Sequence, residues 1–319
     1  MRAIVITRNG GPDVLELRDE PEPTPGDGEL LVDVEAVGVN YRDVYEREGR
    51  GAAYQSSPSQ VCGVEGAGTV VSGAGEFAPG DRVAWVDAPA SYAERVLVPA
   101  AKAVRVPDGT PSELAAAVLL QGMTAHYLCT ATYPVREGDD VLVHAAAGGV
   151  GLLLVQMVKM RGGRVIATTS SAEKAELARA AGADVTIGYD GFSERVRELT
   201  DGRGAAVVYD AVARATFLDS LAALRRRGTM VLYGMASGPV EPYQPDGLRK
   251  GSLYLTRPAL PDYIATREEL LERAGAVLGW VADGSLDVRI GARYPLAEAR
   301  TAHEDLEARR TTGKLVLVP

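Results

Sequence analysis

The middle of the chain alternates between short, continuous runs of apolar residues and longer stretches in which apolar residues recur every three or four positions. Continuous apolar strands are typical of a parallel sheet covered on both faces, and strands alternating with helices at this spacing form βαβ units. The expected strands are Val141–Val143, Arg164–Thr168, Asp184–Ile187, Ala205–Asp210 and Thr229–Tyr233. The expected helices are Leu152–Met160, Ala172–Ala181, Ser193–Thr200 and Thr216–Leu224. This pattern predicts an α/β domain built on a doubly wound parallel sheet.

The N-terminal third follows a different pattern, in which short alternating strands are separated by turns rich in Gly and Pro. Glu29–Val37 and Gly66–Val71 are examples of these strands. Such a pattern is typical of an antiparallel, partly closed β domain. The tail predicts helices at Arg267–Asp283 and Leu296–Arg309 and a closing strand at Leu315–Val318. We expect this tail to return to the first domain and complete it.

The length of the chain supports this division, because 319 residues are more than one small core usually organises. Apolar residues make up 46% and charged residues 24%, which is ordinary for a globular protein. We therefore expect a β domain at residues 1–122, the α/β domain at 123–258, and a return segment at 259–319.

A small-residue turn joins the first strand of the α/β pattern to its first helix. It reads Ala146-x-Gly148-x-x-Gly151, a variant of the G-x-G-x-x-G turn that places a dinucleotide pyrophosphate on a helix N-terminus. Gly148 allows the backbone to approach a phosphate, and Gly151 allows the helix to pack against the strand. The alternative is a tight βα connection without a ligand, which the surrounding βαβ units disfavour.

The end of the second strand of this pattern indicates which dinucleotide binds. A protein that binds unphosphorylated NAD usually has Asp or Glu there, whereas this strand ends in Thr168–Ser171 with Lys174 nearby. Hydroxyl groups and an ammonium favour a 2′-phosphate, so we expect NADPH rather than NADH. The alternative is that Ser171 only caps the next helix and that Lys174 is solvated. Glu173 is expected in the first helical turn, pointing away.

The net charge and the cysteine content limit the expected partners and cellular location of the protein. The net charge of −9 argues against nucleic acid or an anionic membrane as the main partner. No apolar run has the length expected of a membrane span, and no secretory signal is recognisable, so we expect a cytoplasmic protein. Cys62 and Cys129 are the only cysteines and are expected as buried thiols without a disulfide.

Motifs along nearly the whole chain carry a family resemblance. The most specific is His144–Gly151, to which Thr256–Pro258 adds. Further pieces are Gly10–Leu15, Gly38–Tyr45, Gly80–Val83, Gln121–Ala125, Gly182–Asp184, Lys250–Leu255 and Gly313–Leu315. Together they resemble the zinc-free quinone oxidoreductases of the medium-chain dehydrogenase/reductase superfamily, the group that includes zeta-crystallin. The resemblance implies a Rossmann domain plus a GroES-like, mostly antiparallel β domain that the C-terminal tail completes.

The resemblance also bears on metal binding. Zinc-dependent relatives have a Cys after a Gly-x-x stretch near residue 40 and a Gly-His-Glu further on, whereas this chain has Gly38–Tyr41 and Gly63–Glu65, with Val64 in place of the histidine. A catalytic zinc needs three protein ligands, and two cysteines cannot form a four-cysteine structural site. The three histidines are scattered in the sequence. We therefore expect no metal.

An enzyme without a metal needs an acceptor that takes up hydride readily, as quinones do because their reduction restores aromaticity. The resemblance implies NADPH-dependent quinone reduction by hydride or electron transfer from a nicotinamide in the interdomain cleft. Asn40 and Tyr45 are the implied catalytic residues. The Asn40 amide would donate to the acceptor oxygen, and Tyr45 would donate and stack on a flat ring. The alternatives are a turn residue for Asn40 and a buried aromatic for Tyr45.

The remaining site residues are implied contacts of the cofactor. Tyr41 and Thr124 are expected near the nicotinamide, and Leu255 and Arg257 on its side through their main chain. Ser170, Lys174, Tyr189 and Arg309 are expected around the 2′-phosphate. The other expected contacts are those of the glycine turn, Ala146, Gly148, Gly149, Val150 and Gly151, and those of the strand end, Tyr233, Gly234 and Met235.

Two further functions remain open. The first is NADPH-dependent reduction of an alkenal, an enone or an enoyl thioester. The second is a non-catalytic role in nucleotide or RNA binding or as a crystallin, of which the RNA version is disfavoured by the acidic balance. The family implies a homodimer, with the β-rich segment Ser252–Thr256 as the candidate sheet edge. The loop at 49–60 departs from the Gly-x-Tyr-Pro of relatives, which leaves the role of Tyr54 and the acceptor preference open.

Overall fold

The computed structural model describes residues 1–50, 54, 55, 57 and 59–319. The chain forms two compact units, one made of Met1–Leu120 together with Ile264–Pro319, and the other of Gln121–Tyr263. We call them the β unit and the nucleotide unit.

The nucleotide unit is built on a six-stranded sheet in which every strand pair is parallel. Its spatial order is β11-β10-β9-β12-β13-β14, the order of a Rossmann sheet counted from β9. The strands are β9 (Asp140–Val143), β10 (Arg164–Thr168), β11 (Val185–Ile187), β12 (Ala205–Asp210), β13 (Leu224–Leu232) and β14 (Tyr254–Thr256). The predicted parallel sheet is thereby confirmed.

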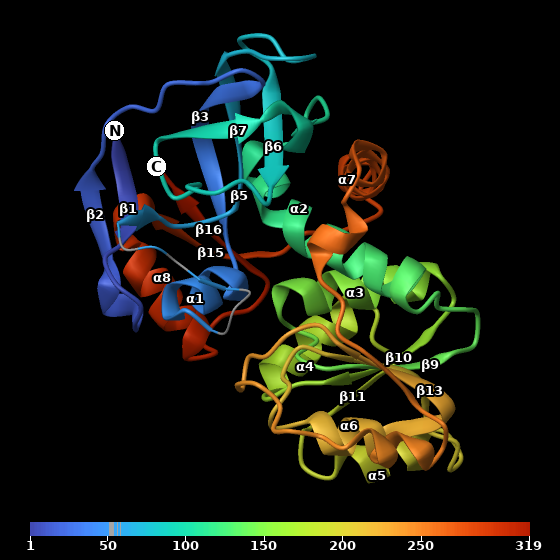
Figure 1. Cartoon of the computed structure of the whole chain (residues 1–319). Coiled ribbons are helices and arrows are strands. Elements are labelled where there is room, and N and C mark those ends of the chain that lie inside the picture. The colour runs from blue at the N-terminus through green and yellow to red at the C-terminus, as the bar shows by residue number, and fades with distance from the viewer. Residues whose placement is uncertain (51–53, 56, 58) are drawn as a thin grey trace. The chain divides into compact units, whose positions relative to one another are not determined.

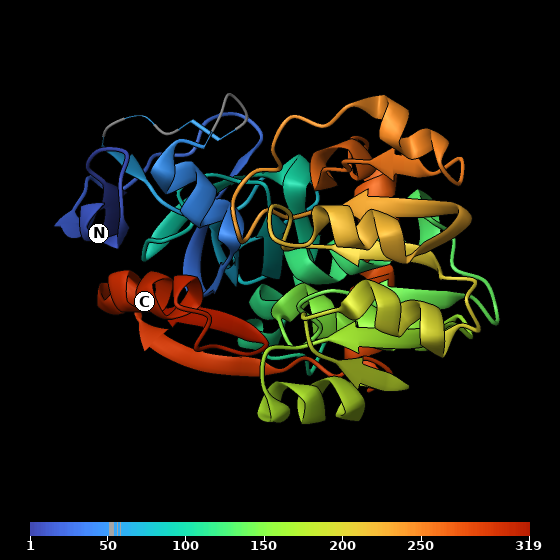
Figure 2. The same ribbon diagram turned by 90° about the horizontal axis from the view of Figure 1, so that it is seen from below.

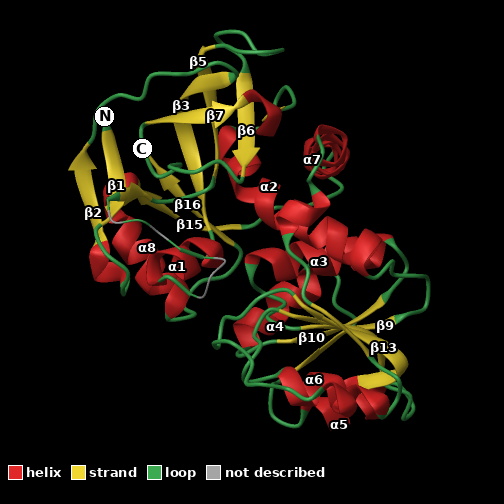
Figure 3. Cartoon of the chain, viewed as in Figure 1, coloured by secondary structure: helices red, strands yellow, loops and turns green. Residues whose placement is uncertain are grey.

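Helices cover both faces of this sheet. Helices α3 and α4 lie on one face and helices α5 and α6 on the other, as Figures 1 and 3 show. Their bounds are Gly149–Met160, Ala172–Ala180, Phe192–Leu199 and Phe217–Ala223. The central strands β9 and β12 are buried along their whole length, which explains their continuous apolar sequence.

One expectation from the sequence of this unit is wrong. Because Arg225–Arg227 follow the expected helix Thr216–Leu224, the sequence predicts a solvated helix end there, but these exposed residues belong to the start of β13. The ladder between β12 and β13 is irregular there, with a register shift between Ala205 and Val207, and Arg227 has a positive φ of 56°. A kinked strand start can expose three successive polar side chains, which a regular buried strand cannot.

The β unit holds a seven-stranded sheet and a three-stranded sheet. The larger sheet has the order β15-β16-β3-β5-β6-β8, with β7 also paired to β3, and all of its pairs except β15 with β16 are antiparallel. The smaller has the order β2-β1-β4. The strands are β1 (Arg2–Ile6), β2 (Leu15–Asp19), β3 (Glu29–Val39), β4 (Gln60–Val61), β5 (Glu65–Ser72), β6 (Arg82–Val86), β7 (Arg95–Pro99), β8 (Ala103–Arg105), β15 (Ile290–Pro295) and β16 (Lys314–Val318).

The C-terminal tail completes the β unit, as predicted. Strand β16 pairs with the end of β3, where Leu315 lies opposite Val39. Helix α8 (Ala299–Glu307) packs beside β2, so that Figure 2 shows the first and last parts of the chain side by side. Helix α7 (Arg267–Ala282) begins with a capping box between Thr266 and Glu269.

Helix α1 (Tyr41–Glu48) follows β3 directly. The carboxylate of Asp43, in the first turn, accepts a hydrogen bond of 2.8 Å from the backbone nitrogen of Asn40 and so closes the N-terminus of the helix. The helix ends at Gly49, whose left-handed conformation (φ 68°) suits a residue without a Cβ. The short 3₁₀ turns are Pro12–Val14, Ala100–Lys102, Pro245–Arg249, Leu260–Tyr263 and Leu296–Glu298.

One helical segment within the described ranges has the length and apolar composition of a membrane span, contrary to expectation. It comprises α2 (Ser112–Tyr127) and the π-helical turn Leu128–Thr132 that continues it. Of the most apolar stretch of 18 residues in this segment, 72% is buried inside the protein, as expected for a core helix. Both cysteines are buried free thiols, as predicted.

Candidate functional site

In the nucleotide unit, the predicted turn joins β9 to α3. Gly148 is the N-cap of α3, and the turn residues Gly148–Val150 are partly exposed. The first-turn amides of Gly149, Val150 and Gly151 are the donors that a helix leaves without internal acceptors. Since the positive end of the helix dipole lies at the same place, this turn fits an anionic pyrophosphate.

The glycines of this turn have different structural roles. A Cβ on Gly151 would overlap the carbonyl oxygen of Ala145 and lie 2.8 Å from the Cα of Ala146, so α3 can approach β9 only with Gly here. A Cβ on Gly148 would have its nearest neighbour at 3.2 Å, again the oxygen of Ala145. The structure thus gives Gly151 the packing role and leaves the surface at Gly148 open to a ligand.

The tip of β10 carries hydroxyl groups and a lysine. Ser171 caps α4 by accepting a hydrogen bond of 3.2 Å from the backbone nitrogen of Lys174, so the capping role considered for Ser171 is confirmed. Ser170 is exposed, and Lys174 is half-buried in the first turn of α4. Glu173 lies in the same turn and is exposed. The hydroxyl of Ser170 and the side chain of Lys174 form a polar tip without a carboxylate at the strand end itself.

A buried polar network lies beneath the glycine turn and was not anticipated from the sequence. The Ser220 hydroxyl donates to Asp210 (3.0 Å), so its oxygen accepts from Nε2 of His144 (2.9 Å). Nδ1 of His144 then accepts from the hydroxyl of Thr168 (2.8 Å). Burial lowers the pKa of His144, which suits this neutral tautomer. The network links the carboxyl ends of β9, β10 and β12, where Rossmann domains bind ligands.

Tyr189 lies against the same turn. Its hydroxyl accepts a hydrogen bond of 3.0 Å from the backbone nitrogen of Ala145, and its ring stacks on that of His144 with centroids 5.9 Å apart. Ala145 has a positive φ of 51°, which the contact helps to hold. The hydroxyl hydrogen of Tyr189 is not consumed by this bond, so Tyr189 can still donate to a bound phosphate.

The other predicted cofactor contacts of this unit lie in or just after strands β13 and β14, except for Thr124. Tyr233–Met235 follow β13 directly and are half-buried. Leu255 lies in the edge strand β14 and is 38% exposed, and Arg257 donates to the carbonyl oxygen of Leu232 (2.9 Å). Thr124 is buried in α2. Their contacts with a nucleotide remain predictions.

In the β unit, the side chain of Asn40 is held by hydrogen bonds to Glu65, Gly38 and Lys314. Its amide nitrogen donates to Oε2 of Glu65 (2.8 Å) and to the oxygen of Gly38 (3.2 Å), and its Oδ1 accepts from the ammonium of Lys314 (2.7 Å). Because an ammonium can only donate, the last contact fixes the orientation of the amide. Both amide hydrogens are engaged, so donation to an acceptor requires Asn40 to exchange one of these bonds.

Glu65 and Lys314 form a buried ion pair with the two charged atoms 2.6 Å apart. Their side chains are 0% and 1% exposed, and the backbone nitrogen of Leu120 also donates to Glu65 (2.6 Å). An ammonium at this distance occupies the carboxylate and repels a cation. No group of three His, Cys, Asp or Glu side chains within the described part of the chain is arranged to hold a metal ion. Metal independence stays a prediction.

Tyr45, the second predicted catalytic residue, belongs to a cluster of aromatic rings on one side of α1. Its ring centroid lies 6.0 Å from that of Tyr41 and 5.4 Å from that of Tyr54, in an edge-on arrangement. The guanidinium of Arg50 lies 5.0 Å from the centre of the Tyr45 ring. The structure thus places Tyr54 beside Tyr45. Other residues of the loop at 49–60, namely 51–53, 56 and 58, lie outside the described residues.

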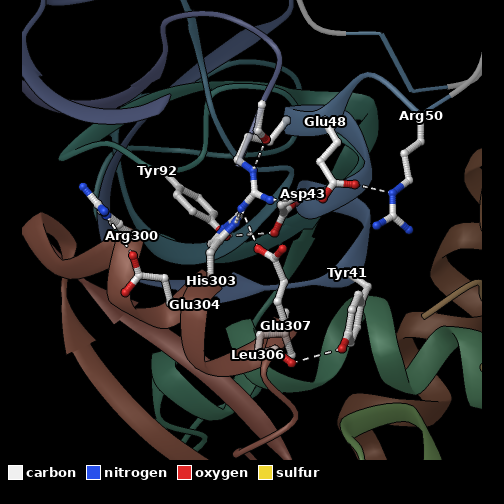
Figure 4. Close-up of polar contacts among 12 residues, drawn as sticks. Tyr41, Asp43, Glu48, Arg50, Tyr92, Arg300, His303, Glu304, Leu306 and Glu307 are labelled. Carbon is white, nitrogen blue, oxygen red and sulfur yellow. Dashed lines mark hydrogen bonds and ion pairs between the residues drawn. The ribbon is translucent and has the colours of Figure 1, made fainter. Parts of the chain in front are cut away.

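Tyr41 and Arg309 are close to each other in this unit. The Tyr41 hydroxyl donates to the oxygen of Leu306 in α8 (3.0 Å), and Figure 4 shows this bond. Burial raises the pKa of Tyr41, and the positive charge of Arg309 acts in the opposite direction. Arg309 is exposed just after the end of α8, with φ 58°.

Two family descriptions match this chain. The alcohol dehydrogenase GroES-like domain matches residues 26–108, and the zinc-binding dehydrogenase family matches residues 149–273. The second description names zinc binding, whereas the described residues of this chain include no group of three His, Cys, Asp or Glu side chains arranged to hold a metal ion.

Known proteins resemble the chain over its full length. A quinone oxidoreductase of Pseudomonas aeruginosa is 45% identical, covering 100% of this chain and 99% of its own, and a 2-haloacrylate reductase of Burkholderia is 39% identical, covering 99% and 98%. Among solved structures, a mycobacterial protein complexed with NADPH superposes with a TM-score of 0.97 at 48% identity, covering 100% of both chains. The quinone oxidoreductase of Escherichia coli complexed with NADPH gives 0.96 at 38%, also covering 100% of both. The chain therefore belongs to the quinone oxidoreductases of the medium-chain dehydrogenase/reductase family.

Proposed function

We propose that this protein reduces quinones with NADPH and without a metal ion. The observation that carries the proposal is the nucleotide unit itself: a glycine turn on a helix N-terminus next to a strand tip that carries hydroxyl groups and Lys174. The same unit belongs to a chain with quinone oxidoreductases as full-length relatives. Its substrate is therefore a small molecule.

NADPH is the cofactor that the residues fit. The first-turn amides of α3 would hold the pyrophosphate, and Ser170 and Lys174 the 2′-phosphate, with donation from Tyr189 and Arg309 as further expected contacts. A 2′-phosphate carries close to two negative charges, so an ammonium within reach favours NADPH over NADH. The bound nicotinamide would supply the hydride.

At the acceptor, the residues of α1 and its N-terminus provide positioning and hydrogen bonding. Asn40 can exchange its longer bond, the one of 3.2 Å to the oxygen of Gly38, for a bond to the acceptor oxygen while it keeps Glu65 and Lys314 as partners. The ring of Tyr45, flanked by Tyr41 and Tyr54, suits a planar aromatic acceptor. These roles account for reduction of a quinone without polarisation by a metal.

A second candidate is reduction of a conjugated alkene. It is favoured by the 39% identity to a 2-haloacrylate reductase, which covers almost the full length of both chains. The two reactions share hydride transfer from the nicotinamide and differ in the acceptor, so the acceptor site decides between them.

The experiment that tests the proposal is an acceptor panel. Purified protein is mixed with NADPH or NADH and with a para-benzoquinone, a naphthoquinone, an enone and a haloacrylate, and the nicotinamide absorbance is followed. Each reaction is run with and without chelator, and metal content is measured in parallel. We expect the highest kcat/KM with quinone and NADPH, unchanged by chelator. Preference for the alkenes would support the second candidate, and NADPH binding without oxidation by any acceptor would support a non-catalytic role.

We further propose a cytoplasmic homodimer without a nucleic-acid partner. Strand β14 forms an open edge of the nucleotide sheet, and its Tyr254 is 61% exposed. An exposed edge strand can pair with the same strand of a second copy. Light scattering on the purified protein should give a dimer mass, and substitution of Tyr254 by Glu should shift the mass toward the monomer.

A further inference from the structure

A chain of buried hydrogen bonds inside the β unit runs from Arg47, near the C-terminal end of α1, through His303 of α8 to the first turn of α1 (Figure 4). The guanidinium of Arg47 lies 3.0 Å from Nδ1 of His303, whose Nε2 lies 3.1 Å from the hydroxyl of Tyr92. The Tyr92 hydroxyl in turn lies 2.9 Å from Oδ2 of Asp43. Arg47, Tyr92, His303 and Asp43 are all fully buried. We call these four residues the α1 relay.

The direction of every bond in the α1 relay is fixed by its first member. A guanidinium can only donate, so Nδ1 of His303 must accept. The neutral ring then carries its hydrogen on Nε2 and donates it to the oxygen of Tyr92. The Tyr92 hydrogen is therefore free to point at Asp43, and the relay delivers a donor to that carboxylate.

The two ends of the α1 relay differ. At the outer end, Arg47 pairs with Glu307 (2.7 Å), whose side chain is 28% exposed to solvent. At the inner end, Oδ2 of Asp43 accepts from both Tyr92 and the backbone nitrogen of Asn40, whereas its Oδ1 is buried without a hydrogen-bond partner among the described residues. Burying an ionised carboxylate with only one hydrogen-bonded oxygen costs free energy. The two hydrogen bonds to Oδ2 are therefore needed to stabilise the charge of Asp43.

We propose that the α1 relay positions the acceptor site: ionised Asp43 holds the first turn of α1, and uptake of a proton by Asp43 loosens that turn and weakens acceptor binding. The inference rests on the proposed function, because α1 carries Tyr41 and Tyr45 and begins at Asn40. Hydrogen bonds to a carboxylate are about twice as strong as those to a neutral carboxyl, so the N-terminus of α1 is held more tightly in the ionised state.

The electrostatic surroundings leave Asp43 as the member that titrates near neutral pH. Burial raises the pKa of Asp43 to about 7, against the hydrogen bonds from Asn40 and Tyr92, which lower it. Burial lowers the pKa of His303 to about 3 and raises the pKa of Tyr92 far above its usual range, so both stay neutral. The other groups that face Asp43 are Lys314 of β16, which favours its ionised form, Glu46 of α1, which opposes it, and the Cys62 thiol, whose pKa burial raises.

The test is the pH dependence of acceptor binding at saturating NADPH. The KM for a water-soluble benzoquinone and kcat are measured between pH 5.5 and 8.5 (roughly the range in which only Asp43 of the relay changes charge). For the wild type we expect the acceptor KM to rise about fivefold as the pH falls through the pKa of Asp43, with a smaller change in kcat. In Asp43→Asn, which cannot ionise, this step should be absent.

Two further variants separate positioning from mere structural support. Tyr92→Phe removes one hydrogen bond to the ionised carboxylate and should move the midpoint of the KM step to higher pH. Tyr294→Phe is the matched control, because it deletes a tyrosine–carboxylate bond of 2.7 Å to Asp305 elsewhere in the same unit. It should leave the midpoint unchanged.

A second readout does not depend on turnover. The infrared difference spectrum between acid and alkaline protein should show the stretch of a protonated carboxyl that is missing in Asp43→Asn. A KM step that persists in Asp43→Asn, an unmoved midpoint in Tyr92→Phe, or the absence of the infrared band each overturns the inference. Failure of the wild type to oxidise NADPH with any quinone refutes the proposed function instead, and leaves the infrared result to report on Asp43.

Discussion

At the scale of single residues, the proposed preference for NADPH rests on the ammonium group of Lys174. Lys174 lies in the first turn of α4, beside the tip of β10, and its backbone nitrogen already donates to the hydroxyl of the capping residue Ser171. Its side chain is the basic group that the sequence singled out at this tip.

We therefore expect Lys174→Ala to weaken NADPH binding by about 1–3 kcal/mol, the usual size of a lost charged contact, and NADH binding far less. Equilibrium titration of both nucleotides, followed by fluorescence, measures the difference. Lys250→Ala, which removes an exposed lysine of the same unit, is the matched control. Equal losses for the two nucleotides would disprove the role of Lys174.

The ion pair of Glu65 and Lys314 gives a second prediction at this scale. Removing one partner of a buried pair leaves the other charge without compensation, so Lys314→Met should cost about 3–5 kcal/mol of unfolding free energy. The double variant Lys314→Met, Glu65→Gln should recover much of this loss. Urea unfolding of the wild type, both single variants and the double variant measures the coupling, and strictly additive losses would contradict it.

Sequence reasoning anticipated single residues where the signal was local. The cap at Ser171 and the packing role of Gly151 follow from nearby residues. The partner of Glu65 does not, because Lys314 is separated from it by 249 positions. The α1 relay was missed for the same reason: its four members come from α1, α8 and the segment before β7, and no local pattern brings them together.

At the scale of elements, the strand–turn–helix of β9 and α3 is the most constrained piece of the nucleotide unit. Gly151 lies against the backbone of Ala145 and Ala146, whereas Gly148 has more room.

Gly151→Ala should therefore destabilise the unit by about 1–3 kcal/mol, the usual cost of overpacking against rigid backbone. Gly148→Ala should change stability much less and act mainly on NADPH affinity. Thermal unfolding and NADPH titration of the two variants separate packing from binding. Comparable losses of stability in both would contradict the different roles assigned to these glycines.

Most elements of the nucleotide unit were predictable because a parallel sheet covered on both faces leaves a clear apolar signal. Strands β10 and β12 have the predicted bounds, and β11 starts one residue later than expected. The predicted start of β13 was wrong because its first residues include three arginines, which are not typical of a buried strand. The register shift between β12 and β13 allows these side chains to be exposed. In the β unit, short strands and bulges interrupt the alternation of apolar and polar residues. The sequence therefore predicted a mostly antiparallel sheet but not the order of its strands.

At the scale of the whole molecule, Asp43 and His303 act on acid stability in opposite directions. Burial raises the pKa of Asp43 to about 7 from its ordinary value of 3.8, so between these pH values the folded protein binds a proton that the unfolded chain does not. This proton stabilises the folded state, and the stabilisation is lost as the pH rises through 7. Burial lowers the pKa of His303 from 6.5 to about 3, so the neutral ring stabilises the folded state at higher pH, and this stabilisation is lost as the pH falls from 6.5. Between about pH 4 and 6.5 the two contributions oppose each other.

Asp43→Asn removes one side of this balance. Relative to the wild type, its unfolding free energy should fall by about 1.4 kcal/mol for each pH unit of acidification between 7 and 4. Urea unfolding at a series of pH values, with Tyr294→Phe as control, measures the slope. A constant difference between wild type and variant across this range would contradict the assignment.

The pairing of β16 with β3 has a consequence for biosynthesis. Residues 121–263 leave the ribosome as one contiguous block and can fold while translation continues. The β unit cannot close at that stage: one flank of the end of β3 stays unpaired, and the carboxylate of Glu65 lacks the ammonium of Lys314, until β16 has been synthesised. A nascent chain stalled before Lys314 would thus hold a finished nucleotide unit and an open β unit, which makes it a target for chaperones that recognise exposed strands.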